Sequence, residues 1–252
     1  MDQCTICIDQ MSNFIGSGVE LSTETLHRHR ACLRHTLFIV ACSFRKRTGG
    51  NRPLWGEVIM KGQSSFFPEF DFLRIQIAEA ASQNKAIHYC GQILGDRRDV
   101  GGAIAVNSAI LTCPTLPAVE RYNGLLYNRL GETAISKLKG GKVTNLLILS
   151  ALHGPTSPRD LLPNYDLMMQ DSIQNESLSS KWLNAVKQNG ARLPEFVGGF
   201  ERCVAAVSRY YESVAKQIAD AAFLPFFPLA FKNSAGTNRT GRLLSGILSE
   251  IG

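Results

Sequence analysis

The chain has 252 residues, of which 44% are hydrophobic and 19% charged, proportions typical of a globular protein and not of a disordered one. No apolar run approaches the ~20 residues that a membrane-spanning helix needs, and the N-terminus lacks the apolar segment of a secretory signal, so we expect a cytoplasmic protein with no membrane association. The net charge of +6 favours nucleic acid or a phosphorylated small molecule as partner, although dispersed surface charges give the same total.

The N-terminal region contains two short-spaced pairs of potential metal ligands. They are Cys4, Cys7, His29 and Cys32. Two such pairs suit tetrahedral Zn²⁺ in a structural site, because four protein ligands leave no position open for catalysis. We therefore predict a zinc module over residues 1–35, similar to treble-clef and LIM-type modules. His27 and His35 are alternative ligands, and the cysteines would serve equally as small buried apolar residues.

From residue 36 to residue 252 the pattern predicts an α/β domain with a mixed or parallel sheet. Residues 37–42 and 143–149 are nearly all apolar, which is typical of strands buried on both faces. Helices are predicted over residues 69–82, 119–138, 195–222 and 241–250. In the third of these, Tyr210 and Tyr211 fall at helical spacing, and we expect them in the core rather than on a stacking surface.

Polar residues follow both predicted strands. Those after the first are Cys42, Ser43, Arg45, Lys46 and Arg47, and those after the second are Ser150, His153, Arg159 and Asp160. If the two strands are parallel neighbours, these residues converge at one edge of the sheet. The resulting basic cleft would suit phosphate or a nucleotide. Asn238 and Arg239 precede the last predicted helix, where backbone N–H groups could bind an anion or simply be capped.

Over about residues 37–185 the chain resembles the YaaA peroxide-stress family, including its actinobacterial branch. The matching positions are Pro117, Ala118, Arg121, Tyr122, Gly124 and Tyr127, then Leu149, Ser150, Ala151, Leu152, Gly154, Pro158, Asp160, Tyr165 and Leu167. The resemblance implies an α/β domain with a positively charged cleft, DNA binding and protection from peroxide damage. It adds Arg121, Tyr122, Tyr127 and Tyr165 to the candidate ligand-binding residues. We find no counterpart of the family after Trp182, and the strand-end sequence at residues 41–47 departs from the usual family opening.

Two functions therefore compete. The first is a YaaA-like protein that binds nucleic acid or a nucleotide in a cationic cleft, in oxidative stress or DNA maintenance. The alternative is an enzyme acting on a nucleotide, nucleoside or modified base, by glycosidic-bond cleavage or group transfer. Asp160 or His153 would be its general acid or base, and Cys42 its nucleophile. Each has a structural alternative: a buried thiol for Cys42, a backbone hydrogen bond for His153, and an ion pair or helix cap for Asp160. A scaffold that recruits a partner through the zinc module is a third reading.

Overall fold

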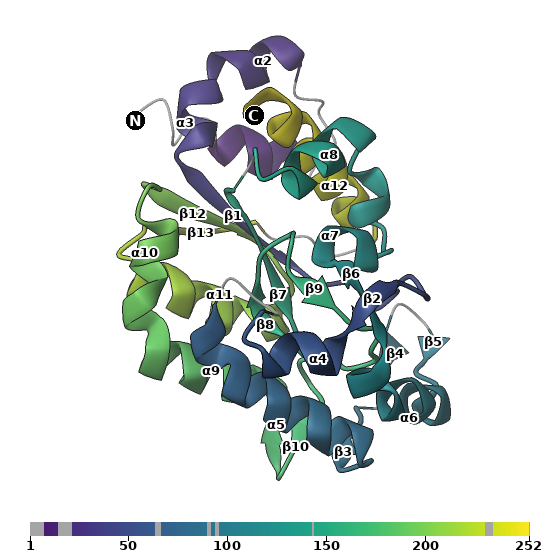
Figure 1. Cartoon of the computed structure of the whole chain (residues 1–252). Coiled ribbons are helices and arrows are strands. Elements are labelled where there is room, and N and C mark those ends of the chain that lie inside the picture. The colour runs from purple at the N-terminus through teal and green to yellow at the C-terminus, as the bar shows by residue number, and fades with distance from the viewer. Residues whose placement is uncertain are drawn as a thin grey trace.

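A mixed five-stranded sheet lies at the centre of the computed structural model, in the order β13-β12-β1-β7-β8 (Figure 1). The structure describes residues 8–14, 22–63, 67–89, 92–93, 96–142, 144–229 and 234–251. The strands of this sheet are β1 (Thr36–Ala41), β7 (Leu146–Ser150), β8 (Gly154–Thr156), β12 (Arg202–Ala206) and β13 (Phe226–Pro228). Strands β13, β12, β1 and β7 are parallel, whereas β8 is antiparallel to β7. The predicted α/β class is confirmed.

The two predicted strands are parallel neighbours. Phe38 of β1 pairs with Leu146 of β7, and the register continues to Ala41 and Leu149. All of β7 is buried, as is β1 up to its last residue. Their continuous apolar sequences are therefore explained by cover on both faces of the sheet.

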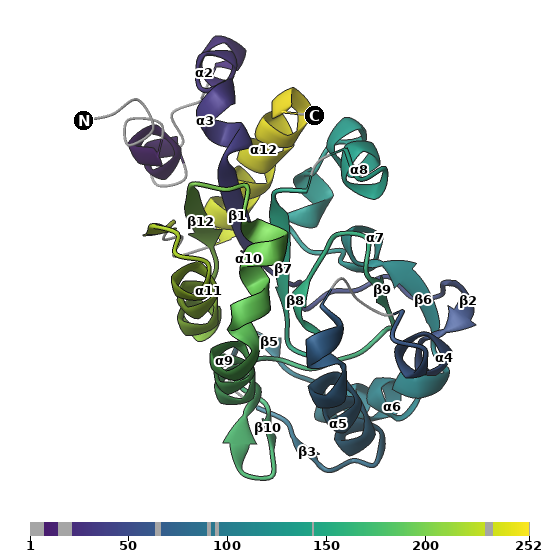
Figure 2. The same cartoon turned by 60° about the vertical axis from the view of Figure 1, so that its left-hand side comes forward.

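Helices cover both faces of this sheet (Figures 1 and 2). Helices α9, α10 and α11 lie on one side, and α8 and α12 lie on the other. The α-helices are α2 (Thr23–Arg28), α3 (Arg30–Arg34), α4 (Trp55–Met60), α5 (Asp71–Ser82), α6 (Val100–Ser108), α7 (Ala118–Arg121), α8 (Glu132–Lys139), α9 (Leu178–Asn189), α10 (Leu193–Val197), α11 (Arg209–Ala221) and α12 (Ser234–Ile251). Short 3₁₀ helices are η1 (Pro68–Phe70), η2 (Ile110–Thr112), η3 (Tyr127–Arg129) and η4 (Gly190–Arg192).

The long connection from β1 to β7 and the segment after β8 form smaller sheets beside the central one. Their orders are β11-β10-β3, β2-β6-β9 and β4-β5. The strands are β2 (Asn51–Leu54), β3 (Ala86–Ile87), β4 (Gln92–Ile93), β5 (Asp96–Arg97), β6 (Pro114–Pro117), β9 (Leu161–Leu162), β10 (Ser172–Ile173) and β11 (Glu176–Ser177).

The N-terminal helices share the core of the main domain. Helices α2 and α3 pack against α12, and Leu26 and Leu33 belong to the same hydrophobic cluster as the residues of β1. The described part of residues 1–35 therefore rests on the α/β domain. The boundary after residue 35 stays a prediction.

The predicted helix over residues 195–222 is wrong. Helix α10 ends at Val197, strand β12 follows, and only α11 continues the helical pattern. Residues 203–207 are consecutive apolar residues, the same signal as in β1, and residues 203–206 lie in β12, buried between β1 and β13. The predicted helix over residues 119–138 is likewise divided into α7, η3 and α8, whereas the helix over 69–82 is confirmed as η1 and α5.

Candidate functional site

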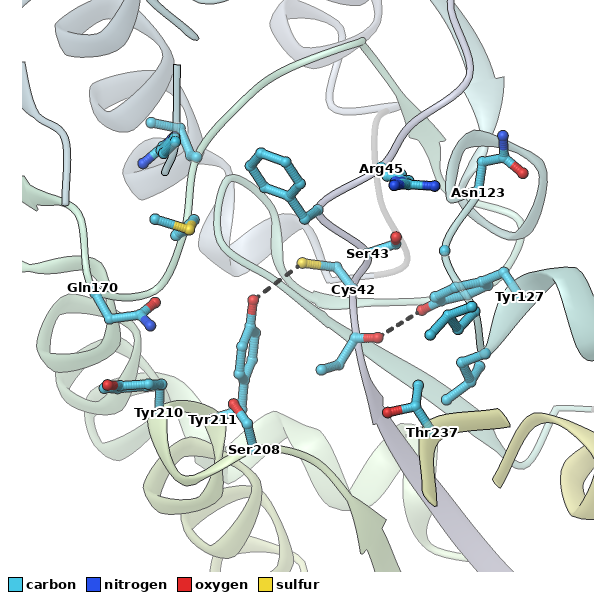
Figure 3. Close-up of a pocket in the computed structure, with 18 of the residues that line it drawn as sticks. Cys42, Ser43, Arg45, Asn123, Tyr127, Gln170, Ser208, Tyr210, Tyr211 and Thr237 are labelled. Atoms are coloured by element: carbon cyan, nitrogen blue, oxygen red, sulfur yellow. Dashed lines mark hydrogen bonds between the residues drawn. The ribbon is translucent and has the colours of Figure 1, made fainter. Parts of the chain in front are cut away.

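A pocket of about 740 Å³ opens at the carboxyl ends of β1 and β12 (Figure 3). The chain passes from β1 to β7 on one side and later returns to β12 on the other, so the pocket lies where the strand order reverses. Open α/β sheets bind their ligands at this switch point. The lining residues are Ala41, Cys42, Ser43, Phe44, Arg45, Tyr89, Arg98, Asp99, Asn123, Gly124, Leu125, Leu126, Tyr127, Asn128, Leu167, Met168, Gln170, Ala206, Ser208, Tyr210, Tyr211 and Thr237.

Two hydrogen bonds fix the inner wall of the pocket. The Cys42 thiol lies 3.3 Å from the Tyr211 hydroxyl. This contact joins the end of β1 to the first turn of α11. The Tyr127 hydroxyl donates to the carbonyl of Ala41 at 2.9 Å. Both contacts are visible in Figure 3. Burial raises the pKa of both tyrosine hydroxyls, so they remain protonated at neutral pH.

Ser43, Arg45 and Asn123 gather at one end of the pocket, opposite Gln170 and Tyr210 (Figure 3). The Asn123 N–H donates to the carbonyl of Arg45 at 2.9 Å, which holds their two loops together. Gly124 lies against Ser43, where an added Cβ would overlap Ser43 Oγ and lie 3.0 Å from its Cβ. A side chain at position 124 would therefore displace the Ser43 hydroxyl.

Three aromatic side chains that are at least partly exposed line the pocket. Phe44 is 49% exposed and Tyr89 is 42% exposed, and both line the pocket together with the half-buried Tyr210. The Arg209 guanidinium lies 4.8 Å from the centre of the Tyr210 ring and donates to its hydroxyl at 2.7 Å. Exposure of apolar side chains to water is unfavourable, so a group of them on a protein surface often indicates a binding site.

The predicted basic cleft is not shown by the described residues. The second arginine of the pocket, Arg98, donates to both carboxylate oxygens of Asp171, at 2.6 and 2.8 Å. It also donates to the Asp166 carboxylate at 2.7 Å. Its charge is thus balanced, and Asp99 adds a negative charge to the wall. Arg45 differs, because it is exposed and no described residue pairs with its guanidinium.

Lys46 lies beside the pocket without lining it. Its ammonium nitrogen is 4.0 Å from the centre of the Tyr165 ring and 3.4 Å from the Phe44 carbonyl oxygen, to which it donates. Burial, opposed by the thiol of Cys42 and the carboxylate of Asp166, lowers the pKa of Lys46 to about 8. A measurable fraction of this amine is therefore neutral near physiological pH.

The loop after β7 lies away from the pocket. It turns back at Gly154, which has φ 66° and packs so closely on the Trp182 ring that a Cβ would overlap it. Ser150 is fully buried, and its hydroxyl lies 2.8 Å from that of Tyr165, which in turn lies 2.9 Å from that of Tyr122. Three of the predicted ligand-binding residues, Ser150, Tyr165 and Tyr122, therefore form a buried chain of hydrogen-bonded hydroxyl groups.

His153 and Asp160, two predicted catalytic residues, are also buried. Burial and the nearby Arg74 charge hold the pKa of His153 well below its ordinary value. Its Nδ1 lies 3.3 Å from the Thr156 hydroxyl. The Asp160 carboxylate accepts a hydrogen bond from the Ser157 N–H at 2.9 Å. Of the three predicted catalytic residues, only Cys42 lines the pocket.

Arg121 is fully buried, and its guanidinium donates only to backbone carbonyls in the contacts observed. The acceptors are Arg47 at 2.5 Å, Gly49 at 3.0 Å, Pro114 at 2.8 Å and Leu162 at 3.1 and 3.2 Å. The Arg121 side chain thus connects three segments of the chain, at residues 47–49, 114 and 162. Arg47 and Arg159 are exposed outside the pocket, the latter beside Gly141.

Helix α12 begins at Ser234, so Asn238 and Arg239 lie inside the helix and not before it. Their backbone N–H groups are therefore not the exposed groups of a helix start, contrary to the expectation of an anion site. The Asn238 side chain accepts a hydrogen bond from Arg129 at 3.0 Å. The neighbouring Thr237 is the residue of this segment that lines the pocket.

The four predicted zinc ligands are only partly described. Cys4 and Cys7 lie outside the described residues, whereas His29 is buried between α2 and α3 and Cys32 lies on α3. The Cys32 sulfur accepts a hydrogen bond from Arg202 at 2.8 Å. Among the described residues no group of three or more His, Cys, Asp or Glu side chains could hold a metal. The zinc module stays a prediction.

Sequence reasoning missed several pocket residues. Tyr210 and Tyr211 were expected in the core; both are partly buried and pack against it, and both also line the pocket. Their proximity to a strand end was hidden because β12 itself was not predicted. Asn123, which follows the Arg121-Tyr122 motif, could have been found by its sequence position beside the family-like residues.

The residue pattern and the fold agree with one family model. The model described as peroxide stress protein YaaA matches residues 97–240, which is more than half of the chain. The match continues beyond Trp182, where the sequence pattern had shown no counterpart, and it includes β7, β12, α11 and the Tyr210 side of the pocket. No curated protein shows significant similarity to the chain. No helix among the described residues is both long and apolar enough to cross a membrane. The chain belongs to the peroxide stress protein YaaA family, which relates it to peroxide stress.

Proposed function

We propose that this protein binds a nucleotide in the pocket between β1 and β12. The observation that carries the proposal is that three aromatic side chains, Phe44, Tyr89 and Tyr210, line a pocket at the switch point of the sheet. The base would stack on these rings, and the phosphate would lie near Ser43, Arg45 and Asn123.

The size and lining of the pocket support a small ligand. A volume of about 740 Å³ lies within the range of roughly 300–1,000 Å³ that is usual for small-molecule sites. Such sites are mainly apolar with a few polar groups that orient the ligand. Aromatic side chains suit bases in particular, because every base has a π face and stacking contributes about 1–3 kcal/mol.

The polar end of the pocket supports a phosphate. Arg45 presents an exposed guanidinium for which no described residue supplies a carboxylate. Arginine binds phosphate through two parallel hydrogen bonds, and the Ser43 hydroxyl and the Asn123 amide supply further donors. The backbone contact between Asn123 and Arg45 keeps these donors together.

Binding is better supported than catalysis. His153 and Asp160 are buried in the β7 turn, so neither lines the pocket as a general acid or base. A nucleotide also fits the site better than duplex DNA, because the pocket is bounded by side chains from several loops and its Arg98 charge is balanced by carboxylates.

Isothermal titration calorimetry with AMP, GMP, CMP and UMP tests the proposal. We expect binding of at least one of them, weakened about tenfold or more by Tyr210→Ala and by Arg45→Gln. Phe72→Ala is the matched control, since Phe72 is 73% exposed on α5 and does not line the pocket. Absence of binding at millimolar concentrations would refute the proposal.

A second measurement separates a nucleotide from nucleic acid. Single-stranded and duplex oligonucleotides are titrated at increasing salt concentration. If the protein's ligand is a free nucleotide, its affinity for oligonucleotides will not exceed that for the mononucleotide. Tighter oligonucleotide binding with a steep salt dependence would show that several phosphates are contacted and would overturn the assignment to a mononucleotide.

A further inference from the structure

We propose that Asp171, which does not itself line the pocket, is the positioning residue for the wall formed by Tyr89, Arg98 and Met168. Its carboxylate sets the place of these three residues and thereby the affinity for a base that stacks on Tyr89. The effect on affinity rests on the proposed nucleotide site, whereas the assembly of the wall rests on contacts within the chain.

The carboxylate of Asp171 connects three segments that line the pocket. Its Oδ1 accepts a hydrogen bond from the Tyr89 N–H at 2.7 Å, and its Oδ2 accepts one from the Met168 N–H at 2.9 Å. One terminal nitrogen of Arg98 donates to both oxygens, at 2.6 and 2.8 Å. Tyr89 and Arg98 precede Asp171 by 82 and 73 residues in the sequence. One carboxylate therefore holds together parts of the wall that are distant in the chain.

The position of Asp171 is fixed from the other side by helix α9. Its side chain is fully buried, and its carbonyl accepts a hydrogen bond at 2.8 Å from the N–H of Leu178, the first residue of α9. Its own N–H donates to the carbonyl of Met168 at 3.0 Å. Gln170, one residue earlier, faces the pocket opposite Asn123 (Figure 3). Helix α9 thus anchors the carboxylate, and the carboxylate anchors the wall.

A purely stabilising ion pair does not explain this arrangement. A buried ion pair contributes little to stability compared with apolar side chains of the same volume, and Arg98 has a second partner in Asp166 at 2.7 Å. The backbone N–H groups that Asp171 accepts from belong instead to pocket residues. Tyr89 is 42% exposed, so packing alone does not fix its ring, and the contact of its N–H with Asp171 determines where the ring lies. A base stacked on Tyr89 therefore depends on Asp171 without touching it.

A double-mutant cycle with Tyr89 tests the effect on the base. Asp171→Asn removes one acceptor oxygen and places an NH₂ group against the donors of the wall. In calorimetric titration with AMP, GMP, CMP and UMP, we expect Asp171→Asn and Tyr89→Ala each to weaken binding about tenfold. The double variant should also bind about tenfold more weakly, and not a hundredfold, because both changes remove the same stacking contact. Additive effects, or full affinity in Asp171→Asn, would overturn the proposal.

Two further variants separate positioning from folding. Asp160→Asn is the matched control, because this buried carboxylate also accepts a backbone N–H, that of Ser157, but does not line the pocket. It should leave nucleotide affinity unchanged. Asp171→Glu keeps the charge that pairs with Arg98 and replaces the Asn variant if that variant does not fold. It should still bind severalfold more weakly, because the longer side chain displaces the backbone of the wall. Full affinity in Asp171→Glu would show that the carboxylate serves only as a counter-ion and would overturn the proposal.

Hydrogen exchange of the full-length protein without nucleotide tests the wall itself. In the Asp171 variant, the N–H of Tyr89 or of Met168 should exchange about tenfold or more faster, because it loses its acceptor. The Asn123 N–H, which donates to the Arg45 carbonyl, is the internal reference and should not change. Unchanged exchange at both positions, or equal acceleration at Asn123, would overturn the proposal. If none of the four nucleotides binds while exchange changes as expected, the failure lies in the nucleotide assignment and not in the wall.

Discussion

The Cys42 thiol lies 3.3 Å from the Tyr211 hydroxyl, and this contact joins the end of the central strand to the helix after β12. The two residues are far apart in the sequence, and they form the inner wall of the pocket because β1 and β12 are parallel neighbours in register. A ligand in the pocket would therefore cover the thiol.

We predict that a bound nucleotide protects Cys42 from alkylation. Cys42 is half-buried and lines the pocket, so iodoacetamide can reach it when no ligand is bound. Cys203 is the internal control, because burial within β12 raises its pKa to about 12 and keeps it unreactive. Peptide mass spectrometry should show modification of Cys42 that falls severalfold with nucleotide. Equal labelling with and without bound nucleotide would mean that the ligand lies elsewhere.

Gly124→Ala should weaken nucleotide binding about tenfold. A Cβ at this position overlaps Ser43 Oγ, so the hydroxyl must move away from the proposed phosphate position. Gly199→Ala is the matched control, since a Cβ there meets nothing within 4 Å. Calorimetric titration of both variants checks the expectation. If Gly124→Ala binds as tightly as the unaltered protein, Ser43 does not contact the ligand.

His153 should make the protein less stable as the pH falls below about 6.5. Its pKa is depressed in the folded state, so below pH 6.5 the unfolded chain binds a proton that the folded chain does not. The free energy of unfolding should then decrease by up to about 1.4 kcal/mol per pH unit from this residue. Urea denaturation of the unaltered protein and of His153→Asn between pH 5 and 8 measures the difference.

The variant should show a weaker decrease than the unaltered protein below pH 6.5, whatever its stability at pH 8. His27→Asn serves as the control for replacing a histidine by asparagine, because the His27 side chain is 70% exposed. Parallel curves for His153→Asn and the unaltered protein would show that His153 is protonated equally in both states.

The predicted zinc module calls for metal analysis of the purified full-length protein. We expect about one zinc ion per chain, lost in the Cys4→Ser and Cys7→Ser double variant. The same variant should unfold at lower temperature, because the free energy of zinc binding also stabilises the fold. Cys203→Ser is a control for cysteine substitution in general. If the unaltered protein contains no zinc and the double variant has the same melting temperature, the prediction of a zinc module is wrong.

Runs of apolar residues correctly predicted two strands of the central sheet, β1 and β7. The apolar runs of β1 and β7 were recognised because strands buried on both faces have few polar residues. The residues after the end of the first strand, from Cys42 on, were predicted to contribute to a site, and Cys42, Ser43 and Arg45 do line the pocket. The same signal at residues 203–207 was hidden by the helical spacing of neighbouring apolar residues, and β12 was therefore missed.

Residue patterns were enough to predict the α/β class, the strands β1 and β7, the family resemblance and the contribution of the first strand end to a site. Which strand completes that site became clear only from the three-dimensional arrangement. Ser150, His153 and Asp160 are polar enough to suggest chemistry, but the turn at Gly154 folds them into the interior. There the Ser150 hydroxyl accepts a hydrogen bond from the His153 N–H, and the Asp160 carboxylate accepts one from the Ser157 N–H. Tyr210 and Tyr211 come instead to the pocket, because β12 pairs with the free side of β1. Strand order depends on the connections between elements that are distant in the sequence, and the local spacing of residues does not reveal it.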